Sequence, residues 1–225
     1  MQGVQEMQYS PKTADHPDTD NTLVIYTQNI QGIRSNEEKL EYISRMMESK
    51  SIDAFMIQEM HLEGDFFKIL LKGQLLIHHG PNVQPHQGAK GGVAIILSPE
   101  MGTNWRNGGS AIRKGETTVG DMTRLLSIDV QIKTKVIIKT KSKIKHMQIL
   151  LLSSYHPTSG YSKADANKFN LQVSAMINQI SEKNILIMGA DLNASIGTRL
   201  LNDKSMNARD CKDPSADLLG PHGNA

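Results

Sequence analysis

The 225-residue sequence is poor in several features that would by themselves define a protein class. It contains one cysteine, Cys211, so no internal disulfide can form and nothing indicates an oxidising compartment. No apolar run approaches the roughly 20 residues that a membrane-spanning helix requires. The N-terminus also lacks the basic-then-apolar order of a secretory signal. We therefore expect an intracellular protein of the nucleus or cytoplasm that is not secreted and has no membrane partner.

The sequence also has little excess of one charge sign. Its formal net charge is only +2, which does not by itself indicate a nucleic-acid partner. The lysines are unevenly distributed, however. Residues 133–145, the lysine strip, hold six lysines and no acid, which places +6 in the strip and leaves −4 on the remainder of the chain. Such a strip can contact phosphates, and we expect Lys139, Lys141 and Lys143 to do so. The alternative is a solvated hairpin whose lysines prevent edge-to-edge strand pairing.

The first part of the chain predicts alternating strands and helices. Residues 1–21 are polar and lack periodicity, so we expect a disordered leader before a domain at 22–225. An apolar strand at 23–30 precedes a helix that begins with a capping box at Ser35 and runs to about Glu48. A second strand follows at 52–59. This order is typical of a layered α/β fold.

The remaining chain predicts more strands and a second capped helix that begins at Ser162. Two of the strands flank the lysine strip, which is therefore expected to be the turn region of a long hairpin. Segments 80–91 and 98–121 are rich in glycine, asparagine and proline and are expected to be loops. The strands are expected at 74–79, 92–97, 124–132, 146–153 and 185–191.

Two buried strands are expected to end in acids. The strand at 185–191 ends with Asp191, and Asn193 follows two positions later, where alternation would point it the same way. The strand at 52–59 ends with Glu59. Acids at the ends of separate strands suit a hard divalent cation, which prefers oxygen ligands. We therefore expect Glu59 and Asp191 to converge on one cleft for metal-assisted phosphate chemistry.

Each of these residues also has a simpler interpretation. Glu59 can be a solvated carboxylate at a strand end. Asn29 closes the first strand before a glycine, where asparagine is usually found for its local hydrogen bonding. Tyr155 follows a strand in the triplet Tyr-His-Pro, and a structural tyrosine packed over a proline turn is the commoner explanation of such a triplet.

In order, the strand ends read Asn-x-x-Gly, Gln-Glu, Gly-Gly-Val-Ala-Ile, Tyr-His-Pro and Gly-Ala-Asp-Leu-Asn-Ala. This ordered set resembles the endonuclease/exonuclease/phosphatase superfamily over roughly residues 23–225. It is closest in character to the apurinic-type endonuclease domains of non-LTR (LINE-like) retrotransposons. The late segment Leu-Gly-Pro-His-Gly-Asn is similar to the segment that follows the Asp-x-Asn motif in retroelement versions.

The resemblance implies a four-layer α/β (α+β) sandwich of two mixed β-sheets flanked by helices, with strand ends and loops forming the cleft. Glu59 would be the main ligand of Mg²⁺ (or Mn²⁺), with Asn29 helping to organise metal and phosphate. Tyr155 would contact the scissile phosphate. Asp191 would orient or deprotonate the attacking water, and Asn193 would hold a non-bridging oxygen. No small-molecule cofactor is implied.

One motif of the superfamily is not found in the sequence. The superfamily's site is completed near the C-terminus by a Ser-Asp-His triplet, whereas the only histidine after Asp191 here is His222 in a Gly-Pro-His-Gly turn. We therefore expect a C-terminally truncated domain whose final strands are missing. Three functions remain open. The first is a Mg²⁺-dependent endonuclease that hydrolyses DNA phosphodiesters and whose rate we expect the truncation to impair. The others are a phosphatase acting on a small ester and an inactive fragment that binds nucleic acid.

Overall fold

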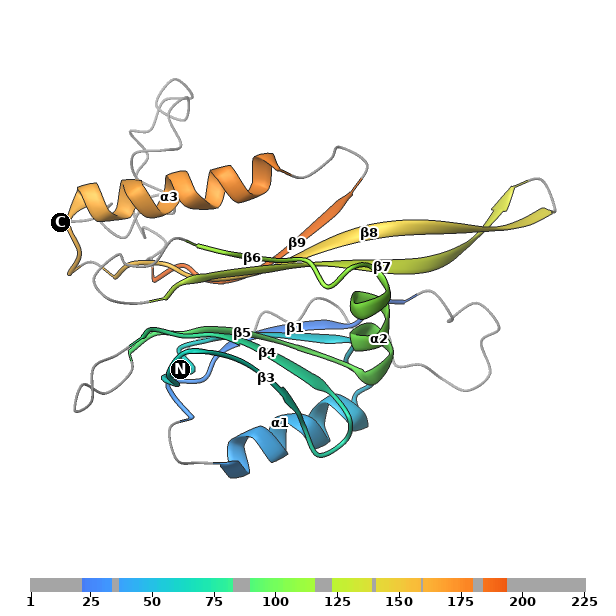
Figure 1. Cartoon of the computed structure of the whole chain (residues 1–225), viewed down its shortest axis with the longest axis horizontal. Helices are drawn as coiled ribbons and strands as arrows, with labels where there is room; N and C mark the ends of the chain where they lie inside the picture. The colour runs from blue at the N-terminus through green and yellow to red at the C-terminus, as the bar shows by residue number, and fades with distance from the viewer. Residues whose placement is uncertain are drawn as a thin grey trace, which may run out of the picture.

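Two mixed β-sheets, packed face to face, form the centre of the fold in the computed structural model (Figure 1). The expected leader, the capping residue Ser35 and the segment 194–225 lie outside the residues that the structure describes. Side chains at 134–138 and 141–145 are not described either. The described residues are 22–33, 37–82, 90–115, 123–138, 141–158, 160–179 and 184–193.

The first sheet has the strand order β1-β2-β5-β4-β3. β1 runs parallel to β2, and the other neighbours are antiparallel. Its three central strands are mainly apolar and contain no exposed residue, as expected for strands covered on both faces. The strands are β1 (Ile25–Asn29), β2 (Ala54–Gln58), β3 (Asp65–Ile69), β4 (Leu75–His79) and β5 (Val93–Leu97).

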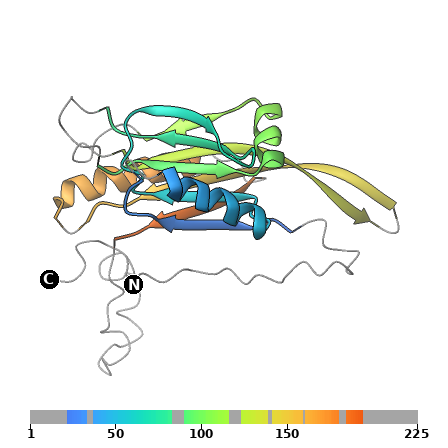
Figure 2. The same ribbon diagram turned by 90° about the horizontal axis from the view of Figure 1, so that it is seen from below.

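The second sheet has the order β6-β7-β8-β9, in which β8 and β9 are parallel and the other pairs are antiparallel. β7 and β8 form a long hairpin that extends well beyond the other strands (Figures 1 and 2). The strands are β6 (Ile112–Lys114), β7 (Leu125–Ile138), β8 (Lys141–Tyr155) and β9 (Ile185–Asp191).

Helices cover the outer faces and make four layers, which confirms the predicted fold class. α1 (Glu37–Ser49) packs Leu40, Ile43 and Met47 against the first sheet. α3 (Lys163–Asn178) packs Phe169, Val173 and Met176 against the second. α2 (Pro99–Asn107) adds Met101 and Trp105 to the core between the sheets. Among the described residues, no helix is long and apolar enough to cross a membrane.

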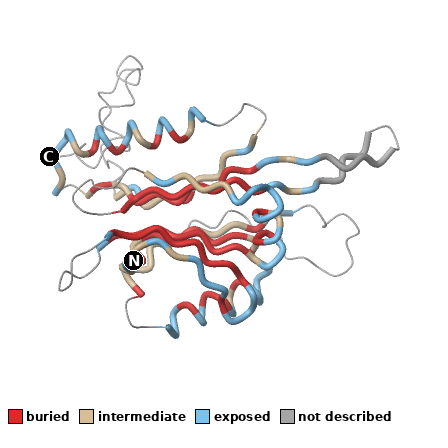
Figure 3. The backbone as a smooth tube through the Cα atoms, in the orientation of Figure 1, coloured by how far each residue is buried: buried red, intermediate tan, exposed pale blue. Residues whose placement is uncertain are grey.

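Alternation along the strands divides the apolar side chains between the inner and outer cores. On β2, Ala54 and Met56 belong to the core between the sheets, whereas Phe55 and Ile57 belong to the core under α1. Figure 3 shows the buried residues concentrated along the facing strands of the two sheets. Residues at the strand ends that continue this alternation therefore share a face with the inner core.

The structure corrects the loop expected at 98–121, because α2 and β6 lie within it. Ser98 caps α2 by accepting a hydrogen bond from Met101 N at 3.3 Å, and Pro99 occupies the first turn, where its missing N–H is harmless. Burial of Met101 and Trp105 then outweighs the poor helix propensity of the glycine and asparagine residues. Strand β3 was not predicted either, because most of its residues are exposed and it lacks the regular alternation of a half-buried strand.

The hairpin around the lysine strip is confirmed, but the strip is not its turn. β7 continues to Ile138 and β8 begins at Lys141, so most of residues 133–145 are paired strand. Threonine, valine and isoleucine residues lie between the lysines. These β-branched residues favour extended backbone, so the strand pairing continues through most of the strip. Lys139 lies outside the described residues.

Candidate active site

Four strands bring polar side chains to one end of the space between the sheets. Because β1 is parallel to β2 and β8 is parallel to β9, the carboxyl ends of each pair lie at the same edge. Asn29 is the last residue of β1, and Glu59 directly follows β2. Tyr155 and Asp191 are cross-strand partners at the ends of β8 and β9. We call these four residues the strand-end site.

The side-chain amide of Asn29 joins the two acids. Asn29 Nδ2 donates to Glu59 Oε1 at 2.8 Å and to Asp191 Oδ2 at 2.6 Å. The two carboxylate oxygens therefore lie no more than about 5.4 Å apart, although the residues are far apart in the sequence. Asn29 Oδ1 in turn accepts from the backbone N–H of Gln31 at 2.9 Å, which orients the amide. The structure thus brings Glu59 and Asp191 into one site.

Glu59 reaches the site through an unusual backbone conformation. It has a φ of +57°, and His61 has a φ of +55°, in the left-handed region that non-glycine residues rarely adopt. Such conformations cost about 1–3 kcal/mol each and persist where surrounding contacts fix them. Here the Glu59 carbonyl accepts from Gly32 N at 2.7 Å, and His61 N donates to Gly91 O at 2.8 Å.

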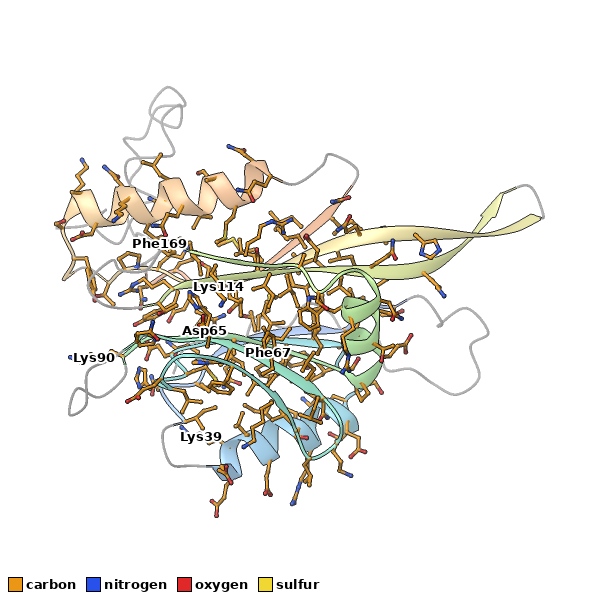
Figure 4. The ribbon with its side chains drawn as sticks, viewed as in Figure 1. Lys39, Asp65, Phe67, Lys90, Lys114 and Phe169 are labelled. Atoms are coloured by element: carbon orange, nitrogen blue, oxygen red, sulfur yellow. The ribbon has the colours of Figure 1, made fainter. Side chains whose placement is uncertain are left out.

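His61 is a neighbour of the site that the sequence pattern did not predict. Its Nε2 lies 3.6 Å from Glu59 Oε2, so a protonated imidazole would pair with that carboxylate. The ring packs against Gly32, where an added Cβ would lie 2.7 Å from His61 Nδ1. Its position two residues after Glu59 was the available signal. Lys39, labelled in Figure 4, donates from its Nζ to the carbonyls of Ile30 and Gly32 in the segment after β1, at 3.3 and 2.8 Å.

Tyr155 is held as a neutral phenol. Burial raises its pKa above the ordinary value, and a hydrogen bond to the Glu59 carboxylate together with that negative charge raises it further. The Arg124 guanidinium and a hydrogen bond with Asn193 act in the opposite direction, but burial and Glu59 outweigh them. The phenol therefore remains a hydrogen-bond donor at neutral pH.

Arg124 packs beside Tyr155 and is a second residue near the site that was not predicted from the sequence. It is 4% exposed, and its guanidinium lies 4.7 Å from the Tyr155 ring centroid and 4.8 Å from that of Tyr161. Its Nη1 donates to the carbonyls of Tyr155 and His156 at 3.1 and 2.9 Å. Cation–π interactions are stronger when the cation is desolvated, so Arg124 helps to hold the two tyrosine rings in place. The sequence signal that could have identified Arg124 is a charged residue immediately before an apolar strand, here β7.

Asn193 approaches the site differently from the prediction. It does not continue the alternation of β9, because the strand ends at Asp191 and Asn193 has a φ of +47° in a turn. Its backbone N–H donates to Asp191 Oδ1 at 3.0 Å, a local bond that asparagine and aspartate favour in turns. Its Nδ2 donates to the His156 carbonyl at 2.6 Å. Asn193 therefore orients Asp191 from the backbone.

The imidazole of His156 is buried behind the site. Burial lowers its pKa to about 4, although the Asp191 charge opposes that shift, so the ring is neutral at pH 7. The ring meets Phe169 of α3 edge-on, with centroids 4.6 Å apart. Figure 4 shows Phe169 on the side of α3 that faces the sheet. His156 therefore contributes to the site through its backbone carbonyl, which accepts hydrogen bonds from Arg124 and Asn193.

The donor atoms at the strand-end site fit a hard cation. The two acids supply carboxylate oxygens, and Mg²⁺ is typically held by only one or two carboxylates while it keeps several waters. Asn29 faces both acids with its amide nitrogen, and its Oδ1 accepts from Gln31 N. Among the described residues, no group of three or more histidine, cysteine, aspartate or glutamate side chains could form a fuller cage. Glu59 and Asp191 offer carboxylate oxygens to such an ion, whereas Asn29 would offer its Oδ1 only after its amide turns away from Gln31 N.

The lysines are not brought to this site. β8 is 15 residues long, so at about 3.3 Å per residue its two ends lie roughly 45 Å apart. Tyr155 stands at one end and Lys141 at the other, with Lys143 paired to Val136 nearby. Any contact between the lysine strip and a nucleic acid would therefore fall far from the strand-end site.

A sandwich of two mixed sheets with acids and amides at the strand ends defines a class of hydrolase scaffolds. The model of the Endonuclease/Exonuclease/phosphatase family matches residues 26–223, and the chain belongs to that family. Enzymes of this family generally depend on a divalent metal. Comparison with the curated proteins gives no match to the sequence.

Solved structures resemble the chain at low sequence identity. A variant of the 3′ phosphatase NExo from Neisseria, bound to a product DNA hairpin, is 14% identical with a TM-score of 0.50, covering 79% of this chain and 60% of that one. The AP endonuclease LMAP from Leishmania major is 14% identical with a TM-score of 0.49, covering 76% and 55%. A humanized D. rerio TDP2 is 13% identical with a TM-score of 0.40, covering 87% and 74%. The chain thus spans less than two thirds of the first two.

Proposed function

We propose that the chain is a divalent-metal-dependent phosphodiesterase that hydrolyses backbone phosphodiester bonds of DNA, of the apurinic-type endonuclease kind carried by LINE-like retrotransposons. The observation that supports the proposal best is the Asn29 amide joined to both Glu59 and Asp191. It brings one acid from each half of the sandwich into a single site at the end of the core between the two sheets.

Glu59 and Asn29 would hold Mg²⁺ or Mn²⁺, which requires Asn29 to turn its Oδ1 from Gln31 N toward the ion. When bound, such an ion polarises a phosphoryl oxygen and stabilises the leaving oxygen. The residues that hold the cation thus come from the first sheet and the loop after β2.

Asp191 is the base or water-orienting group. Its two oxygens each accept one hydrogen bond, from Asn29 Nδ2 and from Asn193 N, so the carboxylate is fixed in orientation. A carboxylate has about four acceptor positions, which leaves room for a water. Tyr155, a neutral phenol, would donate to a phosphate oxygen, which requires its single O–H to leave the Glu59 carboxylate. Asn193 would donate to a second phosphate oxygen, which requires its Nδ2 to leave the His156 carbonyl.

DNA as the substrate is supported by two features. The lysine strip supplies a local excess of positive charge that phosphates attract. One protein with the same fold, the 3′ phosphatase NExo, was solved with a product DNA hairpin.

The test is nicking of supercoiled plasmid by the 225-residue chain in Mg²⁺, with and without a chelator. Glu59→Gln and Asp191→Asn should each reduce the rate at least about 10²-fold, because the first weakens the metal site and the second removes the base. Glu63→Gln is the matched control, since Glu63 is exposed and lies near Glu59 in the sequence, and its rate should stay within about twofold of the wild type.

Binding of Mg²⁺ measured by calorimetry provides a readout independent of activity, and Glu59→Gln should weaken it. Hydrolysis of p-nitrophenyl phosphate without nicking would replace the proposal with a small-ester phosphatase. Plasmid binding without any metal-dependent hydrolysis would replace it with a nucleic-acid binder.

A further inference from the structure

A buried polar layer lies directly beneath the strand-end site. Thr27, Ser153 and Gly189 each stand two positions before a site residue, on β1, β8 and β9 respectively. Because side chains alternate along a strand, positions two apart share a face. All three therefore lie on the inner faces of the sheets, one step deeper than Asn29, Tyr155 and Asp191.

Gln58 connects the members of this layer. Its Nε2 lies 3.2 Å from Thr27 Oγ1, 3.2 Å from Ser153 Oγ and 3.3 Å from the Gly189 carbonyl. Ser153 Oγ also donates back to the Ile57 carbonyl at 3.0 Å. Gln58 is 1% exposed and immediately precedes Glu59. One amide of the first sheet thus contacts its own sheet and both site-bearing strands of the second.

These bonds differ from the apolar contact that makes up most of the interface between the sheets. Other polar contacts across that interface include Asn29–Asp191, Glu59–Tyr155, Asp65–Lys114 and Gly92 N to Thr123 O. The inner core is otherwise largely apolar, and apolar contact is non-directional, so it tolerates sliding of one sheet over the other. A buried hydrogen bond has a preferred length and angle, and a buried amide left without partners is costly. The polar layer therefore adds a directional restraint against a small slip of the sheets beneath the site.

We propose that Gln58 is a positioning residue that fixes the two sheets relative to each other and so holds Asn29 and Glu59 against Tyr155 and Asp191. Gln58 contacts none of the reacting atoms and acts through the strands that carry the site. Its effect on turnover rests on the proposed function, whereas its effect on the geometry of the site does not.

Gln74 provides a matched control. It is 2% exposed and is paired with Ser44, accepting from Ser44 Oγ at 2.7 Å and donating to the Ser44 carbonyl at 2.9 Å. Ser44 is on α1, so this pair lies on the outer side of the first sheet, away from the site. Gln58→Met and Gln74→Met remove the same amide at equal burial and approximately conserve side-chain volume.

The first measurement is the NMR signal of the Asn29 side-chain NH₂, assigned by its absence in Asn29→Ala. One proton bonds to Glu59, which follows β2 of the same sheet, and the other to Asp191 of the second sheet, so relative movement of the sheets must change the shift of the proton bonded to Asp191. Gln58→Met should move the resonance of the proton bonded to Asp191, and Gln74→Met should leave it in place. An unchanged resonance in Gln58→Met, or equal changes in both variants, would overturn the proposal. This readout does not depend on any enzymatic activity.

The second measurement is plasmid nicking below the unfolding temperature of both variants. Gln58→Met should lower kcat about 10²-fold, the effect of displacing reacting groups by about 1 Å, with little change in KM. Gln74→Met should lower the Tm comparably but keep kcat within about twofold of the wild type. Should Gln58→Met not fold, Ser153→Ala removes one partner of the layer and should shift the same Asn29 resonance in the same direction. A folded Ser153→Ala without that shift would equally contradict the proposal.

Discussion

Replacing Gly189 with alanine should damage the site without changing any group within it. A Cβ added at Gly189 would lie 2.6 Å from Thr27 Oγ1, 2.8 Å from Thr27 Cβ and 2.8 Å from Met56 Cε. Carbon atoms pack at about 3.5–4.0 Å. The Met56 methyl is the end of a flexible side chain and can move aside. Thr27 Cβ is fixed to β1, so β1 and β9 must separate by about 0.7–1.2 Å.

Overpacking of this size costs about 1–3 kcal/mol. At about 2–4 °C per kcal/mol for a chain of this length, the Tm should fall measurably. Asn29 lies two residues beyond Thr27, and Asp191 two residues beyond Gly189, so the same separation stretches their 2.6 Å hydrogen bond. A misplacement of about 1 Å can reduce the rate 10²-fold. We expect a rate reduction of that size in plasmid nicking by Gly189→Ala.

Gly160→Ala is the control, because the nearest atom to its added Cβ is 3.9 Å away, an ordinary contact. It should leave both the Tm and the nicking rate unchanged. Thr27→Gly in the Gly189→Ala background removes the clashing atoms and should restore part of the rate. Thermal unfolding and nicking that match the wild type in Gly189→Ala would refute the argument that this glycine permits close approach of the strands.

Two other properties follow from the structure. Burial lowers the pKa of His78 to about 4, so between pH 6.5 and 4 the unfolded chain binds a proton that the folded chain does not. Stability to urea should therefore fall as the pH drops through that window, and by less in His78→Gln; an equal fall in the variant would exclude His78 as the cause. Replacing three strip lysines with glutamine should reduce the slope of log affinity for duplex DNA against log salt, by up to about 0.9 for each phosphate that is no longer neutralised. An unchanged slope would leave the strip as a solubility feature; the three residues are Lys139, Lys141 and Lys143.

The sequence predicts the buried strands well because their apolar runs carry a strong signal. The central strands of both sheets and the helices packed on their outer faces were expected close to where they lie. The elements that were not predicted are short or exposed. α2 depends on the cap at Ser98 and on burial of Trp105, and β3 keeps most of its residues in solvent. Neither leaves a long periodic pattern in the chain.

The strand-end residues were predictable for a related reason. Polar side chains at the ends of apolar strands stand out in sequence, and parallel pairing brings such ends together. The contacts that support them do not stand out. Arg124 covers Tyr155 from a different strand, and Gln58 reaches Gly189 across the sheets. Pairings between distant segments depend on the tertiary arrangement, which local pattern does not encode.

The strand-end site is a junction between two consecutive halves of the chain. The strands of the first sheet are complete by Leu97, and those of the second begin at Ile112. One half supplies Asn29 and Glu59, and the other supplies Tyr155 and Asp191. Most backbone hydrogen bonds of each sheet lie within one half, and Gly92 N to Thr123 O is one that joins the halves. The site therefore exists only when the halves dock, and any change that loosens their docking disperses it before either sheet becomes disordered.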